Sequence, residues 1–411
     1  MNRRSFLQSA AAFPLVARST VLGANDRINI GFVGLGGRAQ YLIGKEDFGA
    51  NRIVAISDCF APRIREAAAL QPPNVTWNQY PDYRKMFEKE KLDAVFVETT
   101  THARVLIAIQ AMQAGFDVYA EKPVCLTVEE GRTLVKAARY YKKVVQAGTQ
   151  QRSMPINIYA SKLVANGKLG KIEKVIVCNF LAPARWKPLP EEKMPDGLDW
   201  DQWCNQTELR PYHTQLHRNW AIWWDYDGGG QSWGVSGWGT HSLDQVQAAL
   251  GTSKTGPVEI WQDQPGQDKP VQMRYHNGAL VSLEQAIIND HQQLGAIFIG
   301  SKGRMQIVRG DFNTDMASLK KGAPDVTKEG PGECVFHLNN FFDCVKSRKA
   351  PNADVEIAQR STTVCLLVNI CRDMGRKLKW DPAAEKFEGD DEANKLLSRP
   401  RRKGFELPSI G

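Results

Sequence analysis

The sequence lacks several features that would direct its interpretation elsewhere. No apolar run reaches the length of a membrane-spanning helix, so we predict no membrane span. The eight cysteines form no C-x-x-C pair and no metal-ligand spacing, and we therefore predict no metal site and mostly free thiols. The formal net charge of +8 is scattered, and no stretch interleaves basic and aromatic residues, so we expect no nucleic-acid partner.

The first residues have the pattern of an export signal. The segment Asn2–Gln8 (NRRSFLQ), followed by SAAAFPLVA, resembles a twin-arginine signal, with paired arginines before a short, weakly apolar stretch. We interpret residues 1–24 as this signal, with the mature chain beginning near Asn25. The protein is then expected in the periplasm or otherwise outside the cytoplasm.

The most informative stretch is Arg27–Ala39 (RINIGFVGLGGRA), in which a predicted strand enters a G-x-G-x-x-A turn that opens a helix. Gly34 permits the tight turn, Gly36 lets a pyrophosphate approach the backbone, and the small Ala39 lets the helix pack on the strand. A second predicted strand, RIVAIS, ends at Asp58, an acid that could accept hydrogen bonds from ribose hydroxyls and repel a 2′-phosphate. This pattern predicts NAD binding, with NADP less favoured. The candidate dinucleotide-binding residues here are Gly34, Gly36, Gly37, Arg38, Ala39 and Asp58.

Strand and helix patterns alternate through residues 25–150, which predicts an α/β domain with a doubly wound parallel sheet of the Rossmann type. The strands expected after Asp58 are Val75–Trp77, Asp93–Val97, Phe116–Ala120 and Lys143–Ala147.

The pattern changes after residue 150. Residues 151–350 are predicted to form an α+β substrate and oligomerisation domain with an open, largely antiparallel sheet, because Asn277-Gly278 joins two strand-like runs as a hairpin turn. Residues 351–411 are expected to supply a helix and tail that pack across both domains. An exposed sheet face would make a homo-oligomer, a dimer or tetramer, the expected state.

A second motif, Glu121-Lys122-Pro123, follows the fifth predicted strand. Together with the glycine-rich turn, it resembles the glucose-fructose oxidoreductase/inositol dehydrogenase family of NAD(P)-dependent enzymes. The resemblance implies that Lys122 lies between nicotinamide and the substrate hydroxyl, after Glu121 and before a cis proline bond. It also implies a cofactor-side role for Thr99 and His102, although His102 is equally suited to cap a helix.

The segment 210–244 is rich in tryptophan and histidine, and its Gly239–Asp244 portion is similar to the family's G-x-H-x-x-D motif. The resemblance implies that His241 is the general base and Asp244 a substrate-binding or orienting acid. An acid common four residues before this histidine is replaced by Gly237, which leaves His217, Asp225 and Asp227 as candidates to replace it. The aromatic residues could stack on sugar rings or form a core beneath a loop. The further candidate substrate residues are Arg152, His213, His217, Trp220, Asp225 and Trp238.

Three functions follow from these observations. The first is an NAD-dependent oxidoreductase acting on a sugar or polyol hydroxyl, with tightly bound cofactor because free NAD is scarce outside the cytoplasm. The second is a redox-neutral NAD-dependent glycosidase or lyase of the same fold. The third is a non-catalytic sugar- or cofactor-binding protein.

Overall fold

The computed structural model describes residues 27–230, 233–284, 294–325 and 334–410, so the predicted export signal lies outside the described residues. The first domain is built on a parallel sheet with strand order β3-β2-β1-β4-β5-β6. Its strands are β1 Asn29–Val33, β2 Arg52–Ser57, β3 Asn78–Tyr80, β4 Ala94–Val97, β5 Asp117–Ala120 and β6 Val145–Ala147. The expected strand at Val75–Trp77 is wrong, since the chain pairs with β2 only from Asn78 onward.

Helices cover both faces of this sheet, as buried parallel strands require. Apolar residues alternate along β1, where Ile30 and Phe32 pack with one group of helices and Val33 with the other. One face is covered by α2 Gly37–Lys45, α3 Ala61–Ala68 and α11 Val335–Ser347, and the other by α4 Tyr83–Lys89, α5 Thr101–Gln113 and α6 Val128–Tyr140. The predicted doubly wound domain is confirmed.

The second domain holds a nine-stranded sheet with order β13-β12-β11-β7-β10-β9-β8-β14-β15. Its strands are β7 Ile172–Cys178, β8 Pro257–Trp261, β9 Val271–Tyr275, β10 Leu280–Glu284, β11 Ala296–Gly300, β12 Gly303–Val308, β13 Asp311–Thr314, β14 Leu378–Asp381 and β15 Lys386–Phe387. Among the described strands of this sheet, only β7 and β10 pair in parallel, so the predicted, largely antiparallel sheet is confirmed. Gly278 has a φ of +87° in the β9–β10 turn, a backbone conformation that favours glycine.

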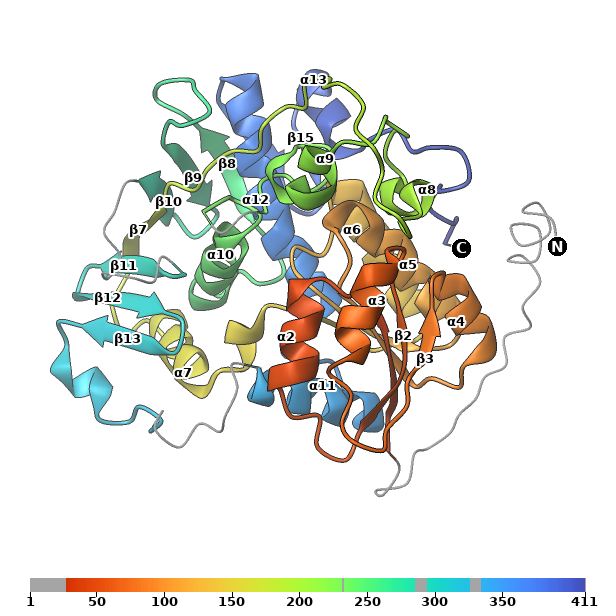
Figure 1. Ribbon diagram of the computed structural model, residues 1–411. Coiled ribbons are helices and arrows are strands. Elements are labelled where there is room, and N and C mark those ends of the chain that lie inside the picture. Colours follow the sequence, from red (N-terminus) through yellow and green to blue (C-terminus); the bar gives the residue numbers. More distant parts are fainter. Residues whose placement is uncertain (1–26, 231–232, 285–293, 326–333, 411) are drawn as a thin grey trace.

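Three helices pack on one face of this second sheet: α7 Pro155–Ala165, α10 Trp238–Ala249 and α12 Val355–Met374. On the other face Ile297 and Val308 pack with Ile176 and Ile299 in a small apolar cluster. Figure 1 shows the two sheets on opposite sides of the molecule with α12 between them.

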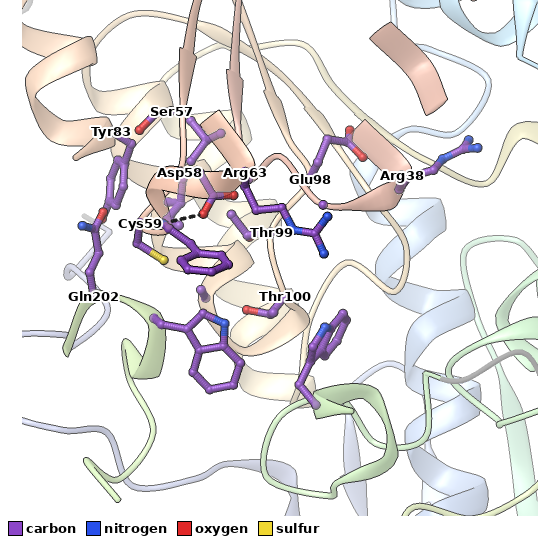
Figure 2. Close-up of a pocket in the computed structure, with 18 of the residues that line it drawn as sticks. Arg38, Ser57, Asp58, Cys59, Arg63, Tyr83, Glu98, Thr99, Thr100 and Gln202 are labelled. Carbon is purple, nitrogen blue, oxygen red and sulfur yellow. Dashed lines mark hydrogen bonds between the residues drawn. The ribbon is translucent and has the colours of Figure 1, made fainter. Parts of the chain in front are cut away.

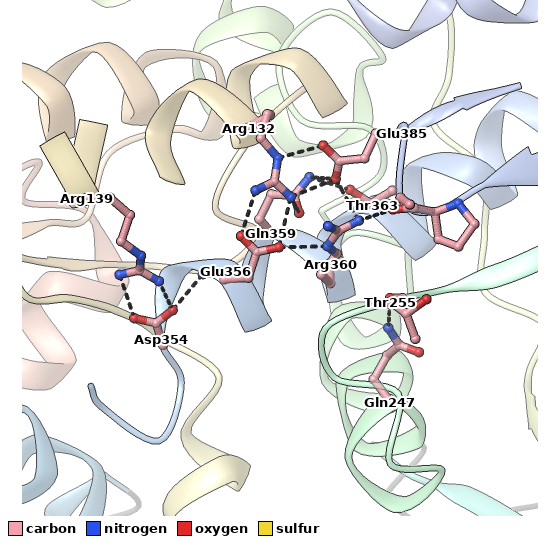
Figure 3. Close-up of polar contacts among 12 residues, drawn as sticks. Arg132, Arg139, Gln247, Thr255, Asp354, Glu356, Gln359, Arg360, Thr363 and Glu385 are labelled. Atoms are coloured by element: carbon pink, nitrogen blue, oxygen red, sulfur yellow. Dashed lines mark hydrogen bonds and ion pairs between the residues drawn. The ribbon is translucent and has the colours of Figure 1, made fainter. Parts of the chain in front are cut away.

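A cluster of charged side chains joins α12 to the first domain (Figure 3). Arg132 of α6 donates to Glu356 at 2.6 Å and to Glu385 at 2.7 Å, and Arg360 pairs with the same two acids. We call Arg132, Glu356, Arg360 and Glu385 the α6–α12 clamp. Because Glu385 lies between β14 and β15, this clamp connects the C-terminal part of the chain to both domains.

All eight cysteines are free thiols, and seven of them are buried. Among the described residues, no helix is long and apolar enough to cross a membrane, and no cluster of three or more potential metal ligands occurs.

Candidate active site

A cavity of about 360 Å³ lies at the carboxyl edge of the first sheet, within the size range of small-molecule sites. Its walls come from the turns that follow β1, β2 and β4 and from a segment of the second domain. Figure 2 shows Arg38 and Glu98 at one end and Tyr83 and Gln202 at the other. The residues of the first domain that line it include Gly34, Gly36, Gly37, Arg38, Asp58, Arg63, Glu98 and Thr99.

The glycine-rich turn fits a dinucleotide pyrophosphate. Gly34 has a φ of +85°, and a Cβ there would lie 2.8 Å from the Thr99 backbone nitrogen. A Cβ at Gly36 or Gly37 would meet no protein atom within 4 Å, so these missing side chains leave open space over the turn. No side chain caps the N-terminus of α2, and its first amides are available to an anion. Ala39 is fully buried in the helix, where its small side chain allows close packing.

Asp58 lies at the end of β2 and lines the cavity. Its Oδ2 accepts a hydrogen bond from the Leu35 amide at 2.6 Å, and its Oδ1 accepts one from the Phe60 amide at 2.9 Å. Burial raises the pKa of this carboxyl group. A carboxylate has about four acceptor sites, so Asp58 supports the glycine-rich turn and keeps acceptor capacity for a ribose hydroxyl.

Two buried acids follow β4 and β5. Glu121 pairs with Arg38 at 2.8 Å and also accepts the Lys122 amide at 2.9 Å. Although burial opposes ionisation, Arg38 and Lys122 keep the pKa of Glu121 below its ordinary value. Glu98 lines the cavity, and neither of its carboxylate oxygens has a hydrogen-bond partner within the described part of the chain. Burial together with the Glu121 charge raises the pKa of Glu98 well above the usual range. Burial and the neighbouring Glu121 charge thus both disfavour the ionised form of Glu98.

Lys122 and His241 come together from the two domains. The Lys122 Nζ donates to the Gly237 carbonyl at 3.0 Å, and Gly237 lies one turn before His241 at the start of α10. The Lys122–Pro123 peptide bond is cis. His241 is 4% exposed, and burial, reinforced by the charges of Arg309 and Lys122, lowers its pKa well below the ordinary value. The imidazole is therefore neutral near pH 7 and has a lone pair that can accept a proton.

Asp244 and Arg152, predicted near the substrate, form a buried ion pair. Arg152 donates from Nε to Asp244 Oδ2 at 2.8 Å and from Nη2 to Oδ1 at 2.9 Å, and Ser361 donates to Oδ1 at 2.6 Å. A bidentate pair of this kind occupies the carboxylate with protein donors. The pair joins η1 (Gln150–Ser153), α10 and α12, and the catalytic role of Asp244 and the substrate role of Arg152 stay predictions.

Three further predicted site residues, His213, Asp225 and His102, have polar partners within the protein, and their site roles stay predictions. His213 caps α9 (Thr214–Arg218), where its Nδ1 accepts the Gln215 amide at 3.0 Å. Asp225 pairs with Arg210 at 2.9 Å. His102 is 1% exposed and lies outside the cavity lining, and its Nε2 donates to the Trp203 carbonyl at 2.8 Å. Thr100, not His102, is the residue before the first turn of α5.

His217 and Trp220, predicted to contact substrate, line the dinucleotide cavity. His217 packs edge-on against Phe60, Trp200 and Trp203, and burial lowers its pKa to about 4. Much of the tryptophan-rich segment is thus a core of its own. Trp238 differs, because it packs 4.5 Å from Trp233, a side chain that is 44% exposed.

The segment 197–227 of the second domain covers one end of the cavity, and we call it the covering segment. Helix α8 (Trp200–Cys204) is fixed to the first domain, where the Asp199 amide donates to the Cys59 carbonyl at 2.8 Å and the Gln202 side chain to the Pro81 carbonyl at 3.1 Å. Gln202, Trp203, His217, Arg218 and Trp220 of this segment line the cavity.

The basic C-terminal tail holds the covering segment down. Arg402 donates to the Asp201 carboxylate at 2.5 Å and to the Asn205 carbonyl at 2.9 Å. The neighbouring Arg401 pairs at 2.6 Å with Glu130 of α6, a buried acid of the first domain. In the sequence these arginines are only part of a scattered positive charge, but in the structure they link the covering segment to the Rossmann domain.

Most of the described chain matches two family models. Residues 28–149 match the model for an oxidoreductase family, NAD-binding Rossmann fold, and residues 155–407 match its C-terminal alpha/beta domain. The chain belongs to the Gfo/Idh/MocA oxidoreductase family. Its first domain is thus the NAD-binding domain of that family, and the predicted resemblance is confirmed in this respect.

Curated relatives in the family include sugar and polyol dehydrogenases. Inositol 2-dehydrogenase of Salmonella typhimurium is 24% identical over 147 residues, which are 36% of this chain and 42% of the relative. Levoglucosan dehydrogenase of Pseudarthrobacter phenanthrenivorans is 28% identical over 95 residues, 23% of this chain and 24% of the relative. The chain therefore matches less than half the length of these relatives.

Solved structures share the fold over nearly their full length. The WlbA dehydrogenase from Bordetella pertussis, in complex with NADH and UDP-GlcNAcA, has a TM-score of 0.60 at 16% identity, covering 87% of this chain and 99% of its own. The aldose-aldose oxidoreductase from Caulobacter crescentus has a TM-score of 0.61 at 17% identity, covering 86% and 100%.

Glu98 and Arg104 are buried charged residues that the sequence analysis did not name as site residues. Glu98 had a usable signal, since it directly follows a buried strand at the carboxyl edge of the sheet. Asp227, one of the three candidates named for the missing acid, is also buried, and its position depends on how the tryptophan-rich segment folds against α5.

Proposed function

We propose that this family member is an NAD-dependent oxidoreductase that acts on a hydroxyl group of a sugar or polyol. The observation that carries the proposal is the hydrogen bond of Lys122 to Gly237 at the start of α10, the helix that also bears the neutral, buried His241. Neither side chain lines the cavity itself, but Lys122 directly follows Glu121, whose carboxylate pairs with the cavity-lining Arg38. A hydroxyl carbon loses a hydride only as its oxygen loses a proton, so a base and a positive charge are needed at that oxygen.

The two side chains suit these roles. His241 accepts the hydroxyl proton, because its imidazole is neutral near pH 7 and its unprotonated ring nitrogen has a lone pair. Lys122 donates a hydrogen bond to the same oxygen and stabilises the negative charge that develops on it. NAD, held at Gly34–Arg38 and Asp58, would supply the hydride acceptor. NAD is favoured over NADP because Asp58 would repel a 2′-phosphate.

A carbohydrate substrate is supported by the aromatic pair Trp233–Trp238. Trp238 lies one turn before His241 on α10, and Trp233 is the exposed member of the pair. Flat aromatic faces stack on the apolar faces of sugar rings. The names of the inositol and levoglucosan dehydrogenases point to substrates of the same class.

The covering segment favours a cofactor that stays bound. Its contacts to the first domain and to Arg402 close one end of the cavity, so release requires this segment to move. A protein exported in the folded state through the twin-arginine route would carry such a cofactor outward. A resident cofactor must be regenerated in place, either by a second sugar or in a redox-neutral cleavage, which is the second candidate function.

Assembly and location complete the proposal. A dimer or tetramer would form through the second domain, where the sheet face opposite α7, α10 and α12 carries the small, largely buried apolar cluster around Ile176 and Ile297. The predicted periplasmic location rests on the segment 1–24 alone.

The test begins with the protein purified from its exported fraction. Its absorbance and intact mass under non-denaturing conditions should reveal a bound nicotinamide dinucleotide. A panel of sugars and polyols should then change the NADH absorbance in single turnovers, and His241→Ala should abolish the change. Release of nitrophenol from aryl glycosides without net NADH formation would instead support the cleavage reaction. Full activity that requires millimolar added NAD in a cofactor-free protein would contradict a resident cofactor.

A further inference from the structure

We propose that Asp227 is a positioning residue whose buried carboxylate holds the positive charge of Lys122 beside the substrate oxygen. The inference rests on the proposed function of Lys122, and it assigns a task to an acid outside the predicted family motif. Asp227 is the last residue of the covering segment before the chain continues to α10, and one oxygen of its buried carboxylate has no hydrogen-bond partner among the described residues.

Asp227 is 1% exposed, and only one of its oxygens is satisfied by the protein. Thr101, the first residue of α5, donates its hydroxyl to Oδ2, while Oδ1 has no hydrogen-bond partner among the described residues. A Cβ on Gly230 would lie 2.2 Å from that free Oδ1, so the chain keeps room for the carboxylate by having glycine there. A buried carboxylate with an unsatisfied oxygen is costly unless a positive charge compensates it.

The backbone around Asp227 is fixed from both domains. The His102 amide donates to the Tyr226 carbonyl at 3.1 Å, which holds the preceding residue against α5. The following residue, Gly228, has its carbonyl occupied by the Ser236 hydroxyl at 3.0 Å and by the Asn369 amide group at 2.8 Å. These hydrogen bonds to the backbone on either side of Asp227 therefore fix the place from which its carboxylate extends.

Burial raises the pKa of Asp227 to about 6, while the Thr101 hydrogen bond and the positive charges of Arg104, Lys122 and Arg399 oppose that rise. Arg104 already donates to the Pro123 and Thr99 carbonyls and, at 3.1 Å, to the Thr101 hydroxyl. Arg399 donates to the Trp224 carbonyl at 2.5 Å. Lys122 donates one hydrogen bond to the Gly237 carbonyl at 3.0 Å, and its ammonium group has two further hydrogens that can face a carboxylate and a substrate.

Lys122 in turn faces Glu121 and Asp227 as acids and Arg309 and Arg38 as like charges. The Glu121 carboxylate already pairs with Arg38 and accepts the Lys122 backbone amide, so its negative charge is partly compensated by groups other than the Lys122 ammonium. Burial lowers the pKa of Lys122, whereas Glu121 and Asp227 raise it. Without Asp227, the half-buried Lys122 would have two positive charges nearby, Arg309 and Arg38. The acid left to oppose them would be Glu121, which is already paired with Arg38.

Asp227 is the member of the three residues suggested for the missing acid that can act here. Asp225 is paired with Arg210, and His217 lies in the dinucleotide cavity. Gly237, where the acid would stand, contributes its carbonyl to Lys122 instead. The Gly237 carbonyl therefore orients the Lys122 ammonium group, and the Asp227 carboxylate, which is farther away, stabilises its positive charge.

The experiment measures the titration of Lys122 directly. The full chain is labelled with trace acetic anhydride from neutral to alkaline pH, and the acetylation of the peptide that contains Lys122 is followed by mass spectrometry. Asp227→Asn should move the midpoint down by about one pH unit, the usual effect of losing a nearby opposite charge. Asp225→Asn is the matched control, because it removes a carboxylate two residues away that is paired elsewhere, and its midpoint should not move.

Asp227→Ser is measured in parallel as a second neutral variant, with circular dichroism to establish folding of both. An unchanged Lys122 midpoint in a folded Asp227 variant would overturn the proposal and leave Asp227 a merely structural group. An equal fall in the Asp225→Asn control would do the same. The measurement needs no substrate, so a protein that oxidises no sugar would refute the proposed function while leaving this result interpretable.

Discussion

Asp58 is the residue on which the choice of NAD depends, and Asp58→Asn tests it with little change of shape. Both Asp58 oxygens already accept hydrogen bonds from backbone N–H groups, those of Leu35 and Phe60. Asparagine has one acceptor oxygen and an NH₂ group, so one of these N–H groups must lose its charged acceptor, or the NH₂ group must face the ribose. A hydrogen bond to a charged group contributes about 1.5–3 kcal/mol. Since 1.4 kcal/mol is a tenfold change, NAD affinity should fall roughly 10- to 100-fold.

The same substitution should narrow the preference for NAD over NADP. It removes the negative charge that repels a 2′-phosphate, while Arg63 stays in the cavity wall. The assay is calorimetric titration of the cofactor-free protein with NADH and NADPH. Asp47→Asn, at an exposed turn where Asp47 accepts only the Gly49 amide, is the control and should bind both as the unmutated protein does. Equal or better binding of NADPH by the unmutated protein would refute the reasoning.

Further predictions concern the reaction, the covering segment and acid stability. Lys122→Ala and His241→Ala should each reduce turnover by about 100-fold or more with NAD binding nearly intact, and high activity in His241→Ala would place the base elsewhere. Arg402→Ala should speed NADH release roughly tenfold or more in stopped-flow displacement, because it removes charge-assisted bonds from the covering segment, and an unchanged rate would contradict a closing role. Glu356 is partly buried, which opposes ionisation, yet the two arginines of the α6–α12 clamp lower its pKa to about 2. This depressed pKa stabilises the fold fully above the ordinary glutamate value, and the contribution, on the order of 2 kcal/mol, is lost as pH falls toward about 2. Urea unfolding at neutral and acid pH should show less pH dependence in Glu356→Gln, and equal dependence would argue against the clamp.

The sequence by itself determined the parts of this protein that depend on local pattern. The G-x-G-x-x-A turn, the acid at the end of β2 and the Asn277-Gly278 hairpin each need particular residues at fixed spacing, since backbone geometry and helix-end electrostatics act over a few residues. The same holds for the doubly wound domain, because alternating strand and helix patterns admit few topologies.

Only the tertiary structure decided which charged residues meet. Asp244 and Arg152 lie 92 positions apart and proved to be partners in a buried ion pair, so an acid that matches a catalytic motif is occupied by the protein itself. Arg402 reached Asp201 across 201 positions and made a basic tail part of the closure over the cavity. A sequence gives the charge of a side chain but not its partner, and the partner determines whether a carboxylate binds a ligand, neutralises an arginine or, like Asp227, is left with one oxygen free.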